Sequence, residues 1–278
     1  MNQLYKTVGI SKQAVHQYAK RQEIFDGRIA QLVLEADELR RDHPGCGVEK
    51  IYKTLKPDFI GRDRFVDTFM QLGYRISKNK NYKRTTIASR LHYPNLIKGM
   101  SFSSPSIVWQ SDITYIRVGD NYYYAVFIID VYTRKIVGYQ VSNHMRAQAN
   151  VMALTKSLKD HQAPIIHHSD RGSQYTYHQY IRLLKKNGCS ISMGLTAQEN
   201  AYAERINRTI KEEYLNYWKP NNFFQLKNYV KKAVENYNNK RTHRSLGYLT
   251  PRQFEIDWPL LKLKNRPLMT IFNNEINV

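Results

Sequence analysis

The chain is poor in cysteine and acidic residues and has no long apolar run. Only Cys46 and Cys189 occur among its 278 residues, which excludes a disulfide framework and a cysteine-rich zinc module. The longest apolar run, Tyr122–Ile129, is eight residues long, far short of the roughly 20 that cross a membrane. No apolar segment follows Met1. The sequence therefore predicts a soluble protein without a signal peptide, in a reducing, cytoplasmic compartment.

Acidic residues are outnumbered almost two to one. The chain carries 23 Asp and Glu against 43 Lys and Arg, a formal net charge of +20. Its hydrophobic fraction of 42% is enough for packed cores, so a disordered chain is excluded. A folded protein with this charge is expected to bind a polyanion, and a nucleic acid is the natural candidate.

One stretch concentrates this imbalance, because no acidic residue lies between Asp67 and Asp112. Its seven basic residues are Arg75, Lys78, Lys80, Lys83, Arg84, Arg90 and Lys98. The stretch is either a solvated linker or a linker that follows a phosphate backbone, and the total charge favours the second. The predicted DNA-binding residues within it are Lys78, Lys80, Lys83 and Arg84.

Composition and patterning divide the chain into four predicted regions. Residues 1–88 form a helical, helix-turn-helix-like region that binds DNA, and residues 89–104 form a basic linker. Residues 105–218 form an α/β core, and residues 219–278 a C-terminal helical extension with a basic tail. A generic three-helix bundle without DNA contact is the alternative for the first region.

The first region shows helical spacing of apolar residues three times. The expected elements are helices within 29–39, 48–55 and 65–72, a separate turn and helix at 8–15 with Ser11 as its N-cap, and a short strand or wing at 74–76.

From residue 107 onward, the sequence becomes rich in β-branched and aromatic residues. Strands are expected at 107–118, 122–130, 135–142, 164–168 and 190–193, and helices at 147–158, 175–186 and 198–218. This order predicts a five-stranded mixed sheet with flanking helices, of the α/β class. Beyond the core, 226–237 has helical spacing, and Thr250–Gln253 has the signature of a capping box.

Three acidic residues of the core stand out. Asp112 lies inside a strand, where a carboxylate is costly unless it is paired or bound to a metal. Asp170 follows the fourth strand, at the edge where open sheets place their chemistry. Glu204 lies on a helix, on a polar stripe with Asn200, Asn207 and Lys211. Three carboxylates from three elements could bind two Mg²⁺ ions for phosphoryl transfer, and Mn²⁺ is expected to substitute.

Other residues have competing interpretations. Asp130 ends the second strand and is interpreted as a strand-end acceptor, although it is the main competitor for the site. His167 and His168 are interpreted as structural residues of a strand. Trp109 and Tyr115 are core residues or stack on an unpaired base near the cut. The remaining candidates for DNA contact are Arg171, Arg208, Lys211, Arg241 and Arg244, the last two with a solvated loop as the alternative.

The motifs around these acids resemble those of insertion-sequence transposases of the IS-three family, downstream-frame (OrfB) type, in the retroviral integrase superfamily. The matching segments are Trp109–Tyr115, His167–Tyr175, Glu199–Glu204 with Lys211, Tyr237–Asn238, Arg241–His243, Ser245–Leu246 and Thr250–Pro251, preceded by a helix-turn-helix within 26–85. The spacing of 33 residues between Asp170 and Glu204 is slightly shorter than is common in the family, and Glu199 stands where Asp is usual.

The resemblance implies an RNase H-like catalytic core over 105–218 in which Asp112, Asp170 and Glu204 bind two Mg²⁺ ions. It implies a bacterial, nucleoid-associated DNA transposase that cleaves transposon ends and joins a 3′-hydroxyl to another phosphodiester. The expected partners are double-stranded DNA, at least one further copy of the chain and an upstream-frame (OrfA-type) protein. The alternatives are an RNase H-like nuclease or resolvase that does not join DNA, and a non-catalytic DNA-binding regulator.

Overall fold

The computed structural model describes residues 9, 11–76 and 92–271. The chain divides into two compact units, Met1–Ile76 and Ser77–Val278. The predicted DNA-binding residues Lys78, Lys80, Lys83 and Arg84 lie outside the described residues. None of the helices in the described ranges is long and apolar enough to span a membrane.

The N-terminal unit is helical, as the apolar spacing predicts. It contains α2 (Lys12–Asp42), α3 (Val48–Leu55) and α4 (Arg62–Gln71). The prediction of two separate helices before Pro44 is wrong, because Ser11 caps a single helix of 31 residues by accepting from the Ala14 amide at 3.1 Å. Leu32 and Phe65 belong to the shared core of the three helices.

The wing predicted at 74–76 is also wrong, since these residues form no strand. Their backbone instead ties the end of the unit to α2. The Arg40 guanidinium donates to the Tyr74 carbonyl at 2.7 Å, and the Tyr74 hydroxyl donates to Asp37. Through these two hydrogen bonds, Tyr74 holds residues 74–76 against α2.

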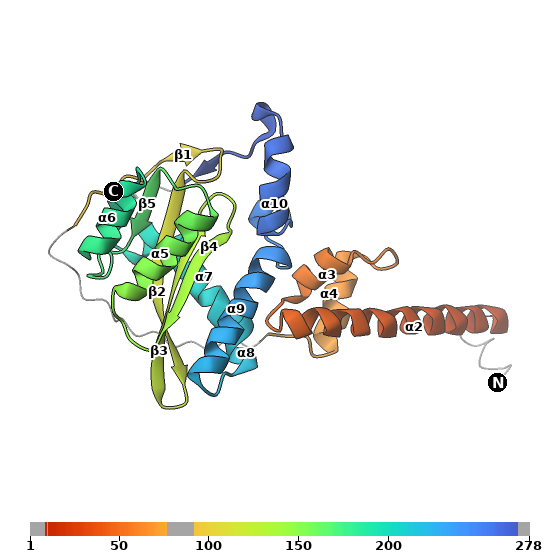
Figure 1. Cartoon of the computed structure of the whole chain (residues 1–278). Coiled ribbons are helices and arrows are strands. Elements are labelled where there is room, and N and C mark those ends of the chain that lie inside the picture. The colour runs from red at the N-terminus through yellow and green to blue at the C-terminus, as the bar shows by residue number, and fades with distance from the viewer. Residues whose placement is uncertain (1–8, 10, 77–91, 272–278) are drawn as a thin grey trace, which may run out of the picture. The chain divides into compact units, whose positions relative to one another are not determined.

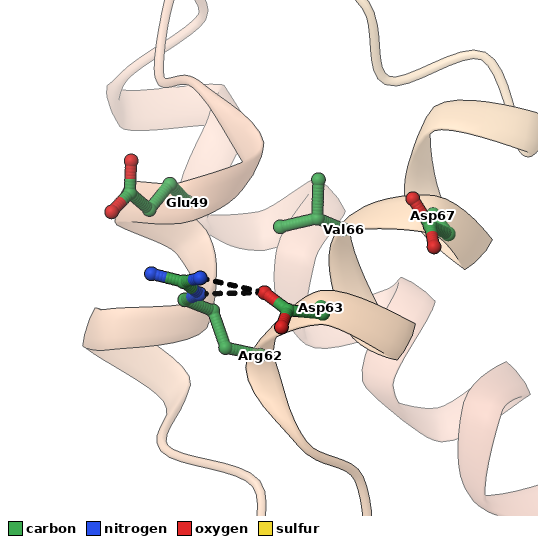
Figure 2. Close-up of a pocket in the computed structure, with 5 residues that line it drawn as sticks. All are labelled: Glu49, Arg62, Asp63, Val66 and Asp67. Atoms are coloured by element: carbon green, nitrogen blue, oxygen red, sulfur yellow. Dashed lines mark hydrogen bonds and ion pairs between the residues drawn. The ribbon is translucent and has the colours of Figure 1, made fainter.

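Acidic side chains surround a pocket of about 440 Å³ between α3 and α4 (Figure 2). Glu49 comes from α3, whereas Arg62, Asp63 and Asp67 come from α4. Arg62 is turned toward Asp63, with Nε 2.9 Å from the carboxylate. The lining holds three carboxylates and one guanidinium, so the pocket itself is unfavourable for a DNA phosphate.

The second unit contains the predicted five-stranded mixed sheet, in the order β4-β3-β2-β5-β6 (Figure 1). The sheet is mixed as predicted, because β2, β3 and β4 form an antiparallel meander, whereas β5 runs parallel to both β2 and β6. The strand bounds are β2 (Val108–Val118), β3 (Asn121–Asp130), β4 (Ile136–Ser142), β5 (Ile166–Ser169) and β6 (Ser190–Met193).

Helices cover both faces of this sheet (Figure 1). On one face, α5 (Gln148–Asp160) and α6 (His178–Lys186) pack on Trp109, Val126 and Ile128. On the other, α7 (Ala201–Ile210) and α9 (Phe223–Asn239) pack on Ile116, Phe127 and Ile129. Alternation along β2 therefore directs Gln110 and Asp112 to the α7 face and Ser111 to the α6 face.

The long helix predicted at 198–218 is interrupted. A 3₁₀ turn, η1 (Ala197–Asn200), leads into α7, and a π-helix, η2 (Lys211–Leu215), separates α7 from the short α8 (Asn216–Trp218). Periodicity over this stretch could not reveal the π-turn, which adds one residue to a helical turn without breaking the apolar pattern.

The remaining elements close the second unit. They are β1 (Ser101–Phe102), η3 (Arg244–Leu246), α10 (Pro251–Asp257), η4 (Trp258–Leu260), η5 (Leu263–Asn265) and β7 (Met269–Thr270). The β1 strand pairs with β7, so the end of the expected linker is bound to the C-terminal extension. Thr250 caps α10 by accepting from the Gln253 amide at 3.1 Å, but the Gln253 side chain bonds to Asp257 instead of completing the capping box.

Candidate active site

Two of the predicted acids lie at one level of the sheet, on neighbouring strands. Ser111 of β2 pairs with Ser169 of β5 in the parallel register, so Asp112 and Asp170 each follow a residue of the same pair. Asp112 accepts from the Ile113 amide at 2.9 Å, and Asp170 accepts from the Gly172 amide at 3.0 Å. Strand register thus holds both carboxylates at one level of the sheet, on two neighbouring strands.

Glu204 comes to the same place from α7. Its neighbours Ala203 and Ile206 are buried against the sheet. Burial, and then the charges of Asp170 and Glu204, raise the pKa of Asp112 from 3.8 to about 8. Burial also raises the pKa of Glu204, with a lowering contribution from Arg208 and a raising one from Asp170. The three carboxylates therefore form one electrostatically coupled group.

The start of α7 is fastened to β2 by a reciprocal clamp. The Gln110 side-chain oxygen accepts from the Tyr202 and Ala203 amides at 3.1 and 3.3 Å, which occupies donors that a helix start leaves unpaired. In return the Asn200 side chain donates to the Ser111 carbonyl at 2.9 Å. Both side chains are buried. The clamp sets how close Glu204 lies to Asp112.

Two further side chains, on α7 and just beyond it, interact with Asp112, one by a hydrogen bond and one through its charge. Asn207 donates to Asp112 Oδ2 at 2.8 Å and is 5% exposed. Lys211 follows Asn207 by four residues on the same stripe; burial lowers the pKa of its ammonium, while the Asp112 charge acts to raise it. The polar stripe predicted from the sequence thus lies over the strand that carries Asp112.

The donor set has the chemistry of a site for a hard divalent cation. All three groups are carboxylates, they come from three elements, and each is partly buried. Their like charges disfavour ionisation of Asp112, a penalty that a cation among them would relieve. Among the residues that the structure describes, however, no three His, Cys, Asp or Glu side chains are grouped closely enough to hold a metal ion.

The competing carboxylates have structural roles. Asp130 is 3% exposed and accepts from the amides of Ser106, Tyr132 and Thr133 at 2.6, 3.0 and 2.8 Å, so it is the strand-end acceptor that the sequence suggests. Glu199 accepts from the Leu195 amide at 2.5 Å and completes a capping box at η1. Both carboxylates are thus engaged by backbone amides.

The histidines and aromatic residues also have structural partners. His167 bonds to the Tyr180 hydroxyl at 3.0 Å, and His168 bonds to Ser192 at 2.8 Å. Trp109 is fully buried in the core. Tyr115 is only partly buried, with its hydroxyl 2.9 Å from the Met145 sulfur. The structural interpretation holds for His167, His168 and Trp109.

The predicted DNA-binding residues fall into two groups. Lys211, Arg208 and Arg171 lie near the acids: the first two act on Asp112 and Glu204, and the third directly follows Asp170. Arg244 is exposed on η3, remote in sequence from the acids. Arg241 makes a two-pronged ion pair with Glu213, with both nitrogen–oxygen distances 2.7 Å. Glu213 occupies the Arg241 guanidinium, so this residue is not expected to bind a DNA phosphate.

Gln110 and Tyr175 were missed by sequence reasoning. Alternation along the strand places Gln110 on the same face as Asp112, so the sequence did contain a signal for it. An uncharged side chain in a strand, however, does not by itself indicate a functional role. Tyr175 bonds to Ser111 at 3.0 Å across the opposite face. This long-range pairing leaves no trace in local sequence.

Comparison with known proteins agrees with this architecture. The integrase core domain family matches residues 103–198, and a second integrase core domain family matches residues 187–251. A chain of the cryo-EM structure of the simian T-cell lymphotropic virus intasome in complex with PP2A regulatory subunit B56 gamma aligns with a TM-score of 0.53 and 14% identity. The alignment covers 80% of this chain and 74% of that one. The core is therefore of the retroviral integrase, RNase H-like class.

Sequence relatives narrow the class. The transposase for insertion sequence element IS904 of Lactococcus lactis is 34% identical over 64% of this chain and 72% of the relative. The insertion element IS600 31 kDa protein of Shigella sonnei is 31% identical over 70% of this chain and 75% of the relative. The chain belongs to the insertion-sequence transposases of the retroviral integrase superfamily. Enzymes of this family carry out DNA transposition as polynucleotidyl transferases.

Proposed function

We propose that this chain cleaves DNA at the ends of a transposon and joins the freed 3′-hydroxyl to another phosphodiester. The observation that carries the proposal is the placement of Asp112 and Asp170 after the paired residues Ser111 and Ser169, with Glu204 close enough that burial and the charges of Asp170 and Glu204 raise the pKa of Asp112 to about 8. Burial and these like charges make ionisation of Asp112 costly, and a bound cation would offset that cost. We therefore assign these three residues the catalytic role.

Asp112, Asp170 and Glu204 would hold two Mg²⁺ ions, with Mn²⁺ as a substitute. Such ions, when bound, activate an attacking oxygen and stabilise a leaving oxygen in phosphoryl transfer. The chain's own groups do the rest. Asn207 and the Ile113 amide keep the Asp112 carboxylate oriented. The cations of Lys211, Arg208 and Arg171 are suited to hold DNA phosphates beside the carboxylates.

The partners follow from this chemistry. Double-stranded DNA would supply both the transposon ends and the target, in the bacterial cytoplasm at the nucleoid. Joining two ends needs at least two active sites, so we propose a homo-oligomer on DNA, and an upstream-frame (OrfA-type) protein as a further partner. The basic residues Lys78, Lys80, Lys83, Arg84 and Arg244 are proposed to contribute affinity along the phosphate backbone.

Labelled duplexes that carry the DNA ends flanking the gene test the proposal. Purified protein is expected to give nicked and joined products in Mg²⁺ but not in Ca²⁺. Glu204→Gln should abolish both products and retain DNA binding, whereas Glu235→Gln, on the exposed face of α9, should leave them unchanged. Nicks without joins would favour the nuclease alternative. Binding without any product, even with the upstream-frame protein added, would favour the regulator.

A further inference from the structure

A π-turn directly follows the helix that carries Glu204. The Asn216 amide donates to the Lys211 carbonyl five residues back, which closes the wide turn of η2. π-turns are rare, weakly favoured, and frequent at functional sites. Lys211, the first residue of this turn, lies four residues beyond Asn207, whose side chain donates to Asp112 at 2.8 Å, so the polar stripe that reaches Asp112 continues into the turn. The shape of the turn therefore decides where the Lys211 ammonium lies.

Two kinds of contact hold the turn. On one side, Tyr214 and Leu215 are 0% and 4% exposed in the core shared with α9. On the other, Glu213 receives Arg241 Nε and Nη2, each at 2.7 Å, in the fork geometry that makes Arg–carboxylate pairs rigid. Their side chains are only 20% and 10% exposed, so water does not screen this pair well.

Arg241 is itself fixed from several directions. Its backbone amide donates to the Asn236 carbonyl at 2.9 Å, just past the end of α9. Its guanidinium lies over the Tyr237 ring at 5.5 Å and approaches the His243 ring at 3.1 Å. The C-terminal extension thus presents a rigid cation to the π-turn.

We propose that the Glu213–Arg241 ion pair is a positioning device for the active site, which holds η2 so that the Lys211 ammonium stays directed at Asp112 and the DNA phosphate. This role rests on the proposed function. Neither Glu213 nor Arg241 touches substrate in this scheme. Both act through Lys211, which makes the C-terminal extension part of the catalytic machinery.

A double-mutant cycle on the joining rate tests the mechanism. Arg241→Gln and Lys211→Ala are each expected to slow joining by about tenfold or more, because coupled contacts of 1–2 kcal/mol have effects of that size. If Arg241 acts through Lys211, the double variant joins no more slowly than Lys211→Ala alone. If the double variant instead slows joining by the product of the two single effects, Arg241 acts independently of Lys211. That result would overturn the proposed positioning role.

A second ion pair supplies the matched control. Lys135 and Glu255 are 2.6 Å apart, with side chains 18% and 37% exposed, and they join the β3–β4 turn to α10, without contact to η2. Lys135→Gln should lower the melting temperature without any coupling to Lys211→Ala. Glu213→Gln, which removes the other charge and keeps the side chain's size, should reproduce the effect of Arg241→Gln. Failure of Glu213→Gln to do so would also overturn the device.

Hydrogen exchange gives a readout that needs neither DNA nor activity. In Arg241→Gln the amides of residues 212–216 are expected to exchange faster, while those of α5 stay protected. Unchanged protection of 212–216 would overturn the device even if the enzyme joins DNA. A wild-type protein that stays inactive with the upstream-frame protein added would instead overturn the proposed function, and with it the role at Lys211, whatever the exchange result.

Discussion

The side-chain amide of Asn207 donates a hydrogen bond of 2.8 Å to the Asp112 carboxylate. It joins the helix that carries Glu204 to the strand that carries Asp112, so the distance between the two acids depends on a neutral residue. The contact also favours the charged form of Asp112, against burial and two neighbouring carboxylates that raise its pKa. Asp112 is thus kept in place at an electrostatic cost to the fold.

That cost predicts a pH-dependent stability in metal-free protein. Asp112 has a folded pKa of about 8 against an ordinary value of 3.8, so the folded state binds the proton more tightly than the unfolded state. The resulting stability is fully present below about pH 4 and is lost as the pH rises through 8. Asp112→Asn should therefore be more stable than wild type at pH 9 in EDTA, on the order of a few kcal/mol, and the difference should shrink toward pH 4.

Urea unfolding at pH 5, 7 and 9 measures this difference. Asp120→Asn is the control, because Asp120 is exposed in the β2–β3 turn. A stability difference between Asp112→Asn and wild type that does not change with pH would contradict the predicted coupling of the carboxylates.

The clamp between β2 and α7 carries a second prediction. Gln110→Met keeps the side chain's size but removes the acceptor for the Tyr202 and Ala203 amides and the 3.3 Å bond to the Glu199 carbonyl. Each buried group left unpaired costs about 1–3 kcal/mol, so the variant should lose on the order of 2 kcal/mol or more and join DNA more slowly. Gln140→Met, on β4 away from α7, should do neither. Equal joining rates per folded molecule for wild type and Gln110→Met would argue against the clamp.

The fold could be predicted from local patterns because each core strand has its own β-branched and aromatic run between turn residues. The meander from Val108 to Ser142 and the parallel pair β5–β6 were predicted within a few residues of their observed ends. The three acids were found because carboxylates are scarce in a basic chain. Scarcity made Asp112 in a strand a strong signal.

The rest depended on contacts between segments far apart in sequence. The pairing of Gln110 with the first turn of α7 spans more than 90 residues, and that of Glu213 with Arg241 spans 28. Local periodicity could not distinguish the π-turn at Lys211 from continuous helix. It also could not show that Tyr74 would bind α2 rather than start a strand. Tertiary partners decided these cases.

The buried histidine beside the site predicts acid sensitivity. Burial and the nearby His168 lower the pKa of His167 from 6.5 to about 3, so the folded state binds its proton less tightly than the unfolded state. Stability is then present above pH 6.5 and is lost as the pH falls toward 3, at about 1.4 kcal/mol per pH unit. Glutamine can still form a hydrogen bond with Tyr180. His167→Gln should therefore reduce the change of unfolding free energy with pH, between pH 6.5 and 4, by the contribution of one titrating proton.

Denaturant midpoints at half-unit pH steps give the slope. The exposed His178, at the start of α6, provides the matched His178→Gln control. A His167→Gln slope identical to wild type would mean that His167 titrates alike in the folded and unfolded chain, contrary to its burial.

Packing between β4 and α5 gives the last prediction. A Cβ atom on Gly138 would lie 1.8 Å from Ser157 Oγ and 3.0 Å from the Ala153 carbonyl oxygen, so the strand approaches the helix as closely as glycine allows. Gly138→Ala should cost about 1–3 kcal/mol of unfolding free energy, and adding Ser157→Ala should recover part of it by removing the nearest atom.

Gly27→Ala is the control, because Gly27 lies inside α2 with nothing within 4 Å of the added Cβ atom. This variant should gain about 0.5–1 kcal/mol of unfolding free energy. Thermal unfolding of the three variants tests the pair. A Gly138→Ala protein as stable as wild type, or no recovery in the double variant, would show that α5 can move away from the sheet.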